Sequence, residues 1–168
     1  MSFSMYQLSI PVLSRALVNL RAILEKGAAH AEARKLDPKT LLTFRLFPDM
    51  FALTRQVQIA TDMAKGCAAR LAGVEVPKYE DNETGFDDLI ARIDKTLAFV
   101  GSCTSAQIDG SETRAIVLKT PRGDLQFKGY DYLMSFVIPN VHFHCVTTYN
   151  ILRHNGVELG KQDYLGKV

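Results

Sequence analysis

Four long segments of this chain of 168 residues carry apolar side chains at every third or fourth position, the spacing of a helix that buries one face. They run from Tyr6 to Leu24, from Pro48 to Gly73, from Phe86 to Val100 and from Tyr130 to Leu152. A strand would alternate at every second residue, so these segments restrict the chain to an all-α class of fold. We therefore expect a four-helix bundle, with residues 1–168 forming a single domain.

Proline and glycine indicate where these helices begin and end. Gly27 and Gly73 should end the first and second helices, because glycine is preferred just beyond a helix C-terminus. Pro11 implies either a kink in the first helix or a start just before it. Asp37 and Pro38 have the pattern of an N-cap and first helical residue, which predicts a short additional helix between the first two long ones.

Between the third and last helical segments the apolar spacing changes to every second residue. Residues 114–119 predict a strand, residues 120–124 a turn and residues 125–127 the returning strand. A lone hairpin is only marginally stable, so we expect it to lie against the helices.

Two histidines, His142 and His144, stand two residues apart in the last segment. On a strand they would share one face and could bind one metal ion, whereas on a helix they point to nearly opposite sides. The helix explains more residues, because no turn signal precedes Gly156, and it requires a kink at Pro139. We therefore place His144 on the buried arc and His142 in solvent.

His144 is the centre of the candidate site. Asn140 and Thr148 lie one turn before and one turn after it, while Asp49 and Gln56 lie on the edge of the second helix's apolar stripe. Buried polar groups need partners, so these side chains form either a hydrogen-bonded network or a functional site. In a site, His144 would be a metal ligand or a general base, because an imidazole titrates near neutral pH.

The remaining polar and thiol side chains of these two helices suggest no chemistry. Gln58 and Asp62 point to the outer face of the second helix. Cys67 and Cys145 lie on or beside apolar arcs, where a thiol is inert.

The composition excludes several classes of function. The 20 Lys and Arg residues are interspersed with 18 Asp and Glu residues, so the chain has no basic patch for nucleic acid or an acidic membrane surface. Its three cysteines include no close pair, which favours a reducing cytoplasm over a disulfide framework. The N-terminal segment is interrupted by Arg15 and Asn19, so it is neither a signal peptide nor a membrane span.

Two stretches, DMFALTRQVQIATDMAKG (residues 49–66) and HCVTTYNILRHNGVELGKQDYLG (residues 144–166), resemble an uncharacterised bacterial family. That family is a domain of unknown function within the DinB/YfiT-like superfamily, and the resemblance covers essentially the whole chain. It implies a four-helix bundle with up-down-down-up connections, often a homodimer, and no established activity. Met50, Phe51 and Phe136 are expected to add apolar surface to such a dimer.

The wider superfamily is similar to metal-dependent thiol transferases and hydrolases, which use three histidines. Carried onto this chain, one ligand matches His144, while Asn140 and Gln56 stand at the other two positions. Amide oxygens bind zinc or nickel less well than imidazole does, so the resemblance implies a degenerate metal site with no cofactor.

Two functions remain open. The first is a cytoplasmic, non-catalytic protein that binds a small molecule. The second is a metal-dependent hydrolase or thiol transferase in which His144 is a remaining ligand or base, with a divalent metal as its cofactor.

Overall fold

The structure, a computed structural model, describes residues 4–121 and 123–166. Its elements in chain order are α1 (Met5–Ala33), α2 (Pro38–Leu42), α3 (Leu53–Ala72), α4 (Phe86–Ser102), α5 (Ser105–Ile108), β1 (Ala115–Thr120), β2 (Gly123–Lys128), α6 (Gly129–Asp131), the π-helix η1 (Tyr132–Val137), α7 (Ile138–His154) and α8 (Lys161–Leu165). A mainly helical fold with one small antiparallel hairpin is therefore confirmed. Within the described ranges, no helix has the length and apolar character needed to cross a membrane.

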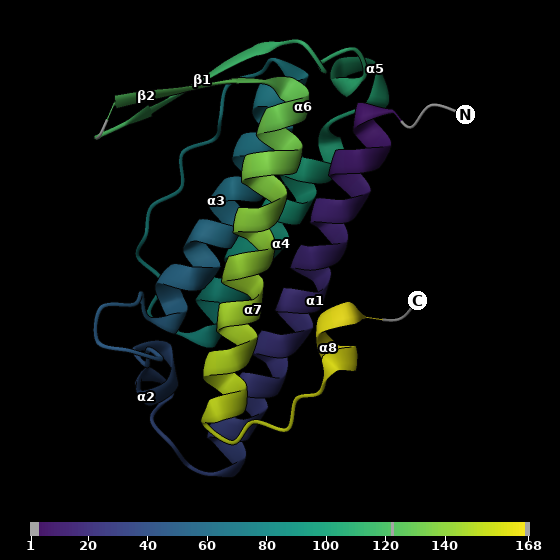
Figure 1. The fold of residues 1–168 in the computed structure, drawn as a ribbon. Coiled ribbons are helices and arrows are strands. Elements are labelled where there is room, and N and C mark those ends of the chain that lie inside the picture. The colour runs from purple at the N-terminus through teal and green to yellow at the C-terminus, as the bar shows by residue number, and fades with distance from the viewer. Residues whose placement is uncertain (1–3, 122, 167–168) are drawn as a thin grey trace.

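The longest helices, α1, α3, α4 and α7, run side by side (Figure 1). Helix α3 packs against α7 and α4, and α1 packs against the same two helices. Their apolar faces meet in a core that includes Leu13, Leu17, Leu20, Val57, Ala64, Leu89, Ile93, Val141 and Ile151. The hairpin projects at one end of these helices, and α2 lies at the other end (Figure 1).

Helix α1 is longer than predicted, because Gly27 does not end it. The helix continues to Ala33, and Gly27 is buried inside it. A Cβ atom at position 27 would lie 3.1 Å from side-chain atoms of both Phe86 and Leu152. The glycine therefore permits close packing of α1 against its neighbours, which sequence alone cannot distinguish from a helix stop. Pro11 lies within α1 at an exposed position.

The prediction that the second long helix starts at Pro48 is wrong. Helix α3 begins at Leu53, and residues 43–52 form an irregular connection that contains a turn. The backbone N–H of Leu53 donates to the carbonyl of Phe44, which closes this connection directly against α2. The predicted end is confirmed, because Gly73 is the C-cap with a φ of 72° that favours glycine. The N-cap at Asp37 is also confirmed.

The last long segment is helical, so the alternative of a strand carrying both histidines is excluded. The kink at Pro139 stays a prediction, but the backbone before this proline is irregular, because the π-helical stretch η1 ends at Val137. The N–H of Ile138 donates to the carbonyl of Leu133, five residues earlier. A π-helical stretch adjusts the backbone register where a proline has no N–H to donate. Helix α7 ends at His154, before Gly156, as predicted.

Candidate functional site

The structure brings together two of the predicted site residues, Gln56 and His144. His144 on α7 is buried, and its Nδ1 lies 2.7 Å from Oε1 of Gln56 on α3. The amide nitrogen of Gln56 donates to the carbonyl of Phe51 at 2.9 Å. That bond fixes the orientation of the amide, so its oxygen faces the imidazole and Nδ1 of His144 must be the protonated nitrogen. The neutral ring therefore keeps a lone pair on Nε2.

The environment of His144 favours this neutral form. Burial, and to a lesser degree the charge of Arg55, lowers the pKa of His144 below its ordinary value. Within residues 4–121 and 123–166, Ser111 Oγ is the one fully buried side-chain nitrogen or oxygen without a partner, so Nε2 of His144 is not sealed from solvent. His144 can thus accept a hydrogen bond or a proton at Nε2.

The other three predicted site residues do not contact the imidazole. Asn140 and Thr148 bond to carbonyls of their own helix segment, at Phe136 (2.6 Å) and His144 (2.9 Å). Asp49 is exposed in the turn before α3, because the helix that would have directed it inward begins only at Leu53. Its predicted place beside His144 is therefore wrong.

These residues do not fit a tight transition-metal site. The two side chains that meet are an imidazole and an amide, and the imidazole's Nδ1 is already used. No cluster of three or more His, Cys, Asp or Glu side chains suited to a metal is present in the part of the chain that the structure describes. Zinc sites normally supply three or four strong nitrogen, sulfur or carboxylate ligands, so this donor set is too weak.

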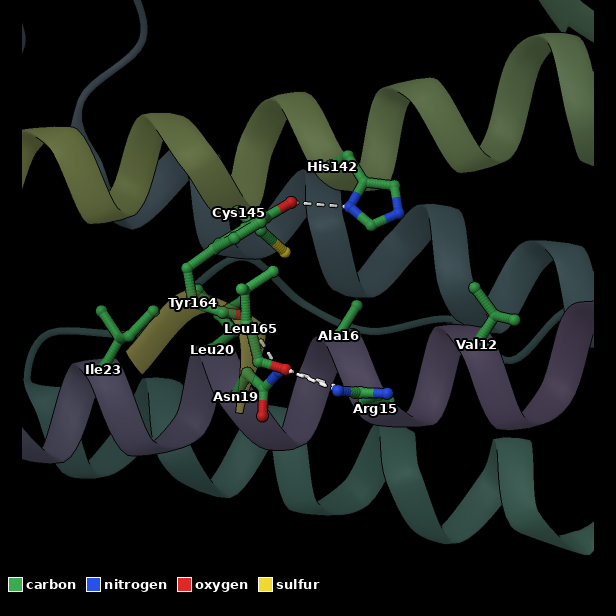
Figure 2. Close-up of a pocket in the computed structure, with 10 residues that line it drawn as sticks. All are labelled: Val12, Arg15, Ala16, Asn19, Leu20, Ile23, His142, Cys145, Tyr164 and Leu165. Atoms are coloured by element: carbon green, nitrogen blue, oxygen red, sulfur yellow. Dashed lines mark hydrogen bonds between the residues drawn. The ribbon is translucent and has the colours of Figure 1, made fainter. Parts of the chain in front are cut away.

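His142 was predicted to lie in solvent, but the structure half-buries it. Its Nδ1 lies 2.7 Å from the hydroxyl of Tyr164 on α8, the short helix that folds back beside α1 (Figures 1 and 2). Burial is the main cause that raises the pKa of Tyr164, so its phenol is neutral at pH 7. Helix α8 lies beyond Gly156, where the sequence pattern predicts no further helix, and it covers this side of α7.

His142 and Tyr164 line a cavity of about 330 Å³ between α1, α7 and α8 (Figure 2). The residues around it are Val12, Arg15, Ala16, Asn19, Leu20, Ile23, His142, Cys145, Tyr164 and Leu165. Most of these are apolar, and those from α1 recur at helical spacing along one face. The cavity is therefore an elongated, mainly apolar space with a few polar groups.

Helix α8 is held over this cavity mostly by polar contacts. Arg15 and Asn19 donate to the backbone carbonyls of Leu165 and Tyr164, each at 2.9 Å. Lys26 forms an ion pair of 2.6 Å with Asp163. None of the residues of α8 is fully buried, although Tyr164 packs against the hydrophobic core.

A second polar cluster lies beneath residues 74–85, which connect α3 to α4. Arg92 donates to Glu83 at 2.7 Å, to Asp62 at 2.8 Å and to the hydroxyl of Thr61 at 2.8 Å. Gln58 also donates to Glu83, at 2.8 Å. The prediction that Gln58 and Asp62 face outward is therefore wrong, because the connecting segment covers this face of α3 and supplies their partners.

Cys67 and Cys145 are buried free thiols, as predicted, and Cys103 is also buried and free. Burial raises the pKa of both Cys67 and Cys145 to about 12. Such thiols carry almost no thiolate at neutral pH, so neither side chain is suited to act as a nucleophile.

The arrangement of the helices and hairpin defines a class, the DinB-like helical proteins. The crystal structure of a DinB family member protein from Shewanella denitrificans superposes with a TM-score of 0.88 and 42% sequence identity, over 97% of this chain and 92% of that one. More specifically, residues 5–165 match the family described as "Domain of unknown function (DUF1993)", and the chain belongs to that family. No curated protein matches it.

Proposed function

We propose that this protein is a non-catalytic, small-molecule-binding four-helix bundle of the DinB-like superfamily, with a degenerate metal site. The observation that carries the proposal is the cavity between α1, α7 and α8. Its volume of about 330 Å³ falls in the range typical of ligand pockets, which are mainly apolar and have a few polar groups. It is lined by His142 rather than by His144, so binding does not require the superfamily's metal positions.

The pairing of Gln56 with His144 supports the non-catalytic part of the proposal. An amide that accepts from Nδ1 and donates to a backbone carbonyl satisfies its buried polar groups without any ligand. The pair thus has the properties of a structural hydrogen bond between α3 and α7.

A metal-dependent hydrolase or thiol transferase is the second candidate. It is favoured by one observation, the neutral Nε2 of His144 that remains open to solvent. In that case Gln56 would orient the imidazole by accepting from its Nδ1, as the hydrogen-bond partners of metal-bound histidines commonly do. The further ligands would have to come from groups other than Asp49, which points into solvent.

Filling the cavity tests the first candidate. We expect 1-octanol to cause saturable NMR shifts of the backbone amides of Ala16, Asn19 and Cys145. The variant Ala16→Phe should abolish them, because the new ring occupies the space that Ala16 lines. Ala29→Phe is the matched control, since Ala29 is exposed on the same helix and does not line this cavity. Absence of saturable shifts in the unaltered protein would refute the proposal.

We also propose that the protein is a cytoplasmic homodimer with residues 1–168 as one domain. Phe51, whose carbonyl accepts from Gln56, is 56% exposed, and Phe143, whose ring contacts His144, is 57% exposed, so both add exposed apolar area. Phe136, by contrast, is half-buried against Phe127 and Tyr132 and contributes little. Sedimentation of a dilute sample as a monomer would exclude the dimer.

A further inference from the structure

Arg15 is the one lysine or arginine that lines the cavity, and no aspartate or glutamate lines it. Its Nε and Nη2 donate to the carbonyl of Leu165, at 3.3 and 2.9 Å. In residues 4–121 and 123–166 Arg15 forms no ion pair. A guanidinium carries five N–H donors, so the Nη1 edge remains for an anionic partner.

The lining of the cavity extends along α1. Its lining residues on α1 extend from Val12 to Ile23, which at 1.5 Å per helical residue is roughly 16 Å. A volume of about 330 Å³ spread over that length suits a chain better than a broad ring system. Figure 2 shows Ile23 at one end of this lining and Val12 at the other, with Leu20, Ala16 and Arg15 between them.

We propose that the cavity binds a linear aliphatic monocarboxylate. The carboxylate pairs with the guanidinium of Arg15, and the hydrocarbon chain lies along α1 toward Leu20 and Ile23. This inference rests on the proposed function, because it assigns a ligand class to the same cavity. A planar guanidinium matches a carboxylate with two parallel hydrogen bonds, and the apolar lining removes the chain from water.

The charge of the lining favours a carboxylate over a phosphate. A phosphate group carries more charge and more acceptor oxygens, and its sites usually supply several cations or backbone N–H groups. Here a single guanidinium is present, accompanied by the amide of Asn19 that already donates to Tyr164. One cation neutralises one carboxylate.

The test compares octanoate with 1-octanol, which have the same chain length but different head groups, by titration calorimetry at neutral pH. We expect octanoate to bind about tenfold more tightly, because a charged hydrogen bond adds roughly one decade in affinity. Arg15→Met should weaken octanoate binding about tenfold more than it weakens 1-octanol binding, because both ligands share the effect of the lost contact to Leu165 and only octanoate also loses the ion pair. Lys26→Met is the matched control, since it also removes a contact to α8 but does not line the cavity. This variant should affect the binding of octanoate and of 1-octanol equally, because the loss of the Lys26–Asp163 ion pair removes no charge from the cavity lining.

The possible failures are distinguishable. Equal binding of octanoate and 1-octanol would overturn the carboxylate assignment and leave the proposed function intact. An equal loss of affinity for the two ligands in Arg15→Met would show that Arg15 acts only by holding α8, which also overturns the assignment. Binding of neither ligand to the unaltered protein would refute the proposed function itself.

Discussion

Replacing Arg92 with methionine should lower the free energy of unfolding by about 3 kcal/mol. The side chain of Arg92 is only 3% exposed, and that of its partner Glu83 is 8% exposed. Methionine keeps much of the aliphatic packing but leaves the Glu83 carboxylate buried without its cationic partner. The loss lies at the lower end of the range for buried pairs, because Asp62 is partly exposed and can be solvated. Urea denaturation measures this change in the free energy of unfolding.

Arg21→Met is the control for this experiment. Arg21 also contacts two carboxylates, those of Glu25 and Asp94, but its side chain is 35% exposed. Exposed pairs contribute little, so we expect a loss of less than about 1 kcal/mol. If both variants lost the same small amount, the cluster around Arg92 would not be needed to hold residues 74–85 against α3.

Replacing His144 with alanine should lower the free energy of unfolding by about 2–3 kcal/mol. The change removes the imidazole N–H that donates to Oε1 of Gln56, so that oxygen is left unsatisfied in a buried position. It also opens a cavity between α3 and α7. Asn150→Ala, at an exposed position of the same helix, should change stability little. A loss no greater than that of the control would show that the Gln56–His144 bond does not stabilise the fold.

The same variant should alter the pH dependence of stability. The pKa of His144 is lower in the folded protein than in the unfolded chain, where it is about 6.5. As the pH falls through that value the unfolded chain binds the proton first, so stability is complete at higher pH and is lost on acidification. We expect the unaltered protein to lose more stability than His144→Ala between about pH 7.5 and about pH 5.5. Parallel losses would contradict the lowered pKa.

The long helices and the hairpin could be predicted from the sequence because each has a local signal. Apolar residues at helical spacing identify α1, α3, α4 and α7, and alternation with a Pro-containing turn identifies β1 and β2. The ends of the helices were harder to predict, because a glycine can either end a helix or allow close packing inside one. Gly73 ends a helix, whereas Gly27 permits close contact with Phe86 and Leu152.

Two segments that cover the helices, residues 74–85 and α8, could not be predicted. Their positions depend on contacts with residues far away in the sequence. Residues 74–85 carry a polar, loop-like sequence, yet Glu83 reaches Arg92 and Gln58. Helix α8 has five residues, too few for a periodic pattern to identify it. The apolar pair Tyr164 and Leu165 near the end of the sequence was the available signal that this segment packs back onto the helices.

The candidate site was therefore only partly predictable. The apolar periodicity of the two helices predicted that Gln56 and His144 could meet inside the bundle, and their side chains do meet. Asp49 was misplaced by an error of five residues in the start of α3. The cavity beside His142 was missed entirely, because it exists only where α8 covers α1 and α7.

We propose that Gln56 and His144 form a hydrogen-bonded pair at positions where the superfamily resemblance implies metal ligands. Elemental analysis of untagged protein, purified without added metal, tests this most directly, with His144→Ala and Gln56→Ala analysed in parallel. We predict transition metal far below one equivalent per chain in all three proteins, because an imidazole and an amide are too few strong ligands. Near-stoichiometric zinc, nickel or iron in the unaltered protein, lost in His144→Ala, would contradict the claim and favour the metal-dependent enzyme.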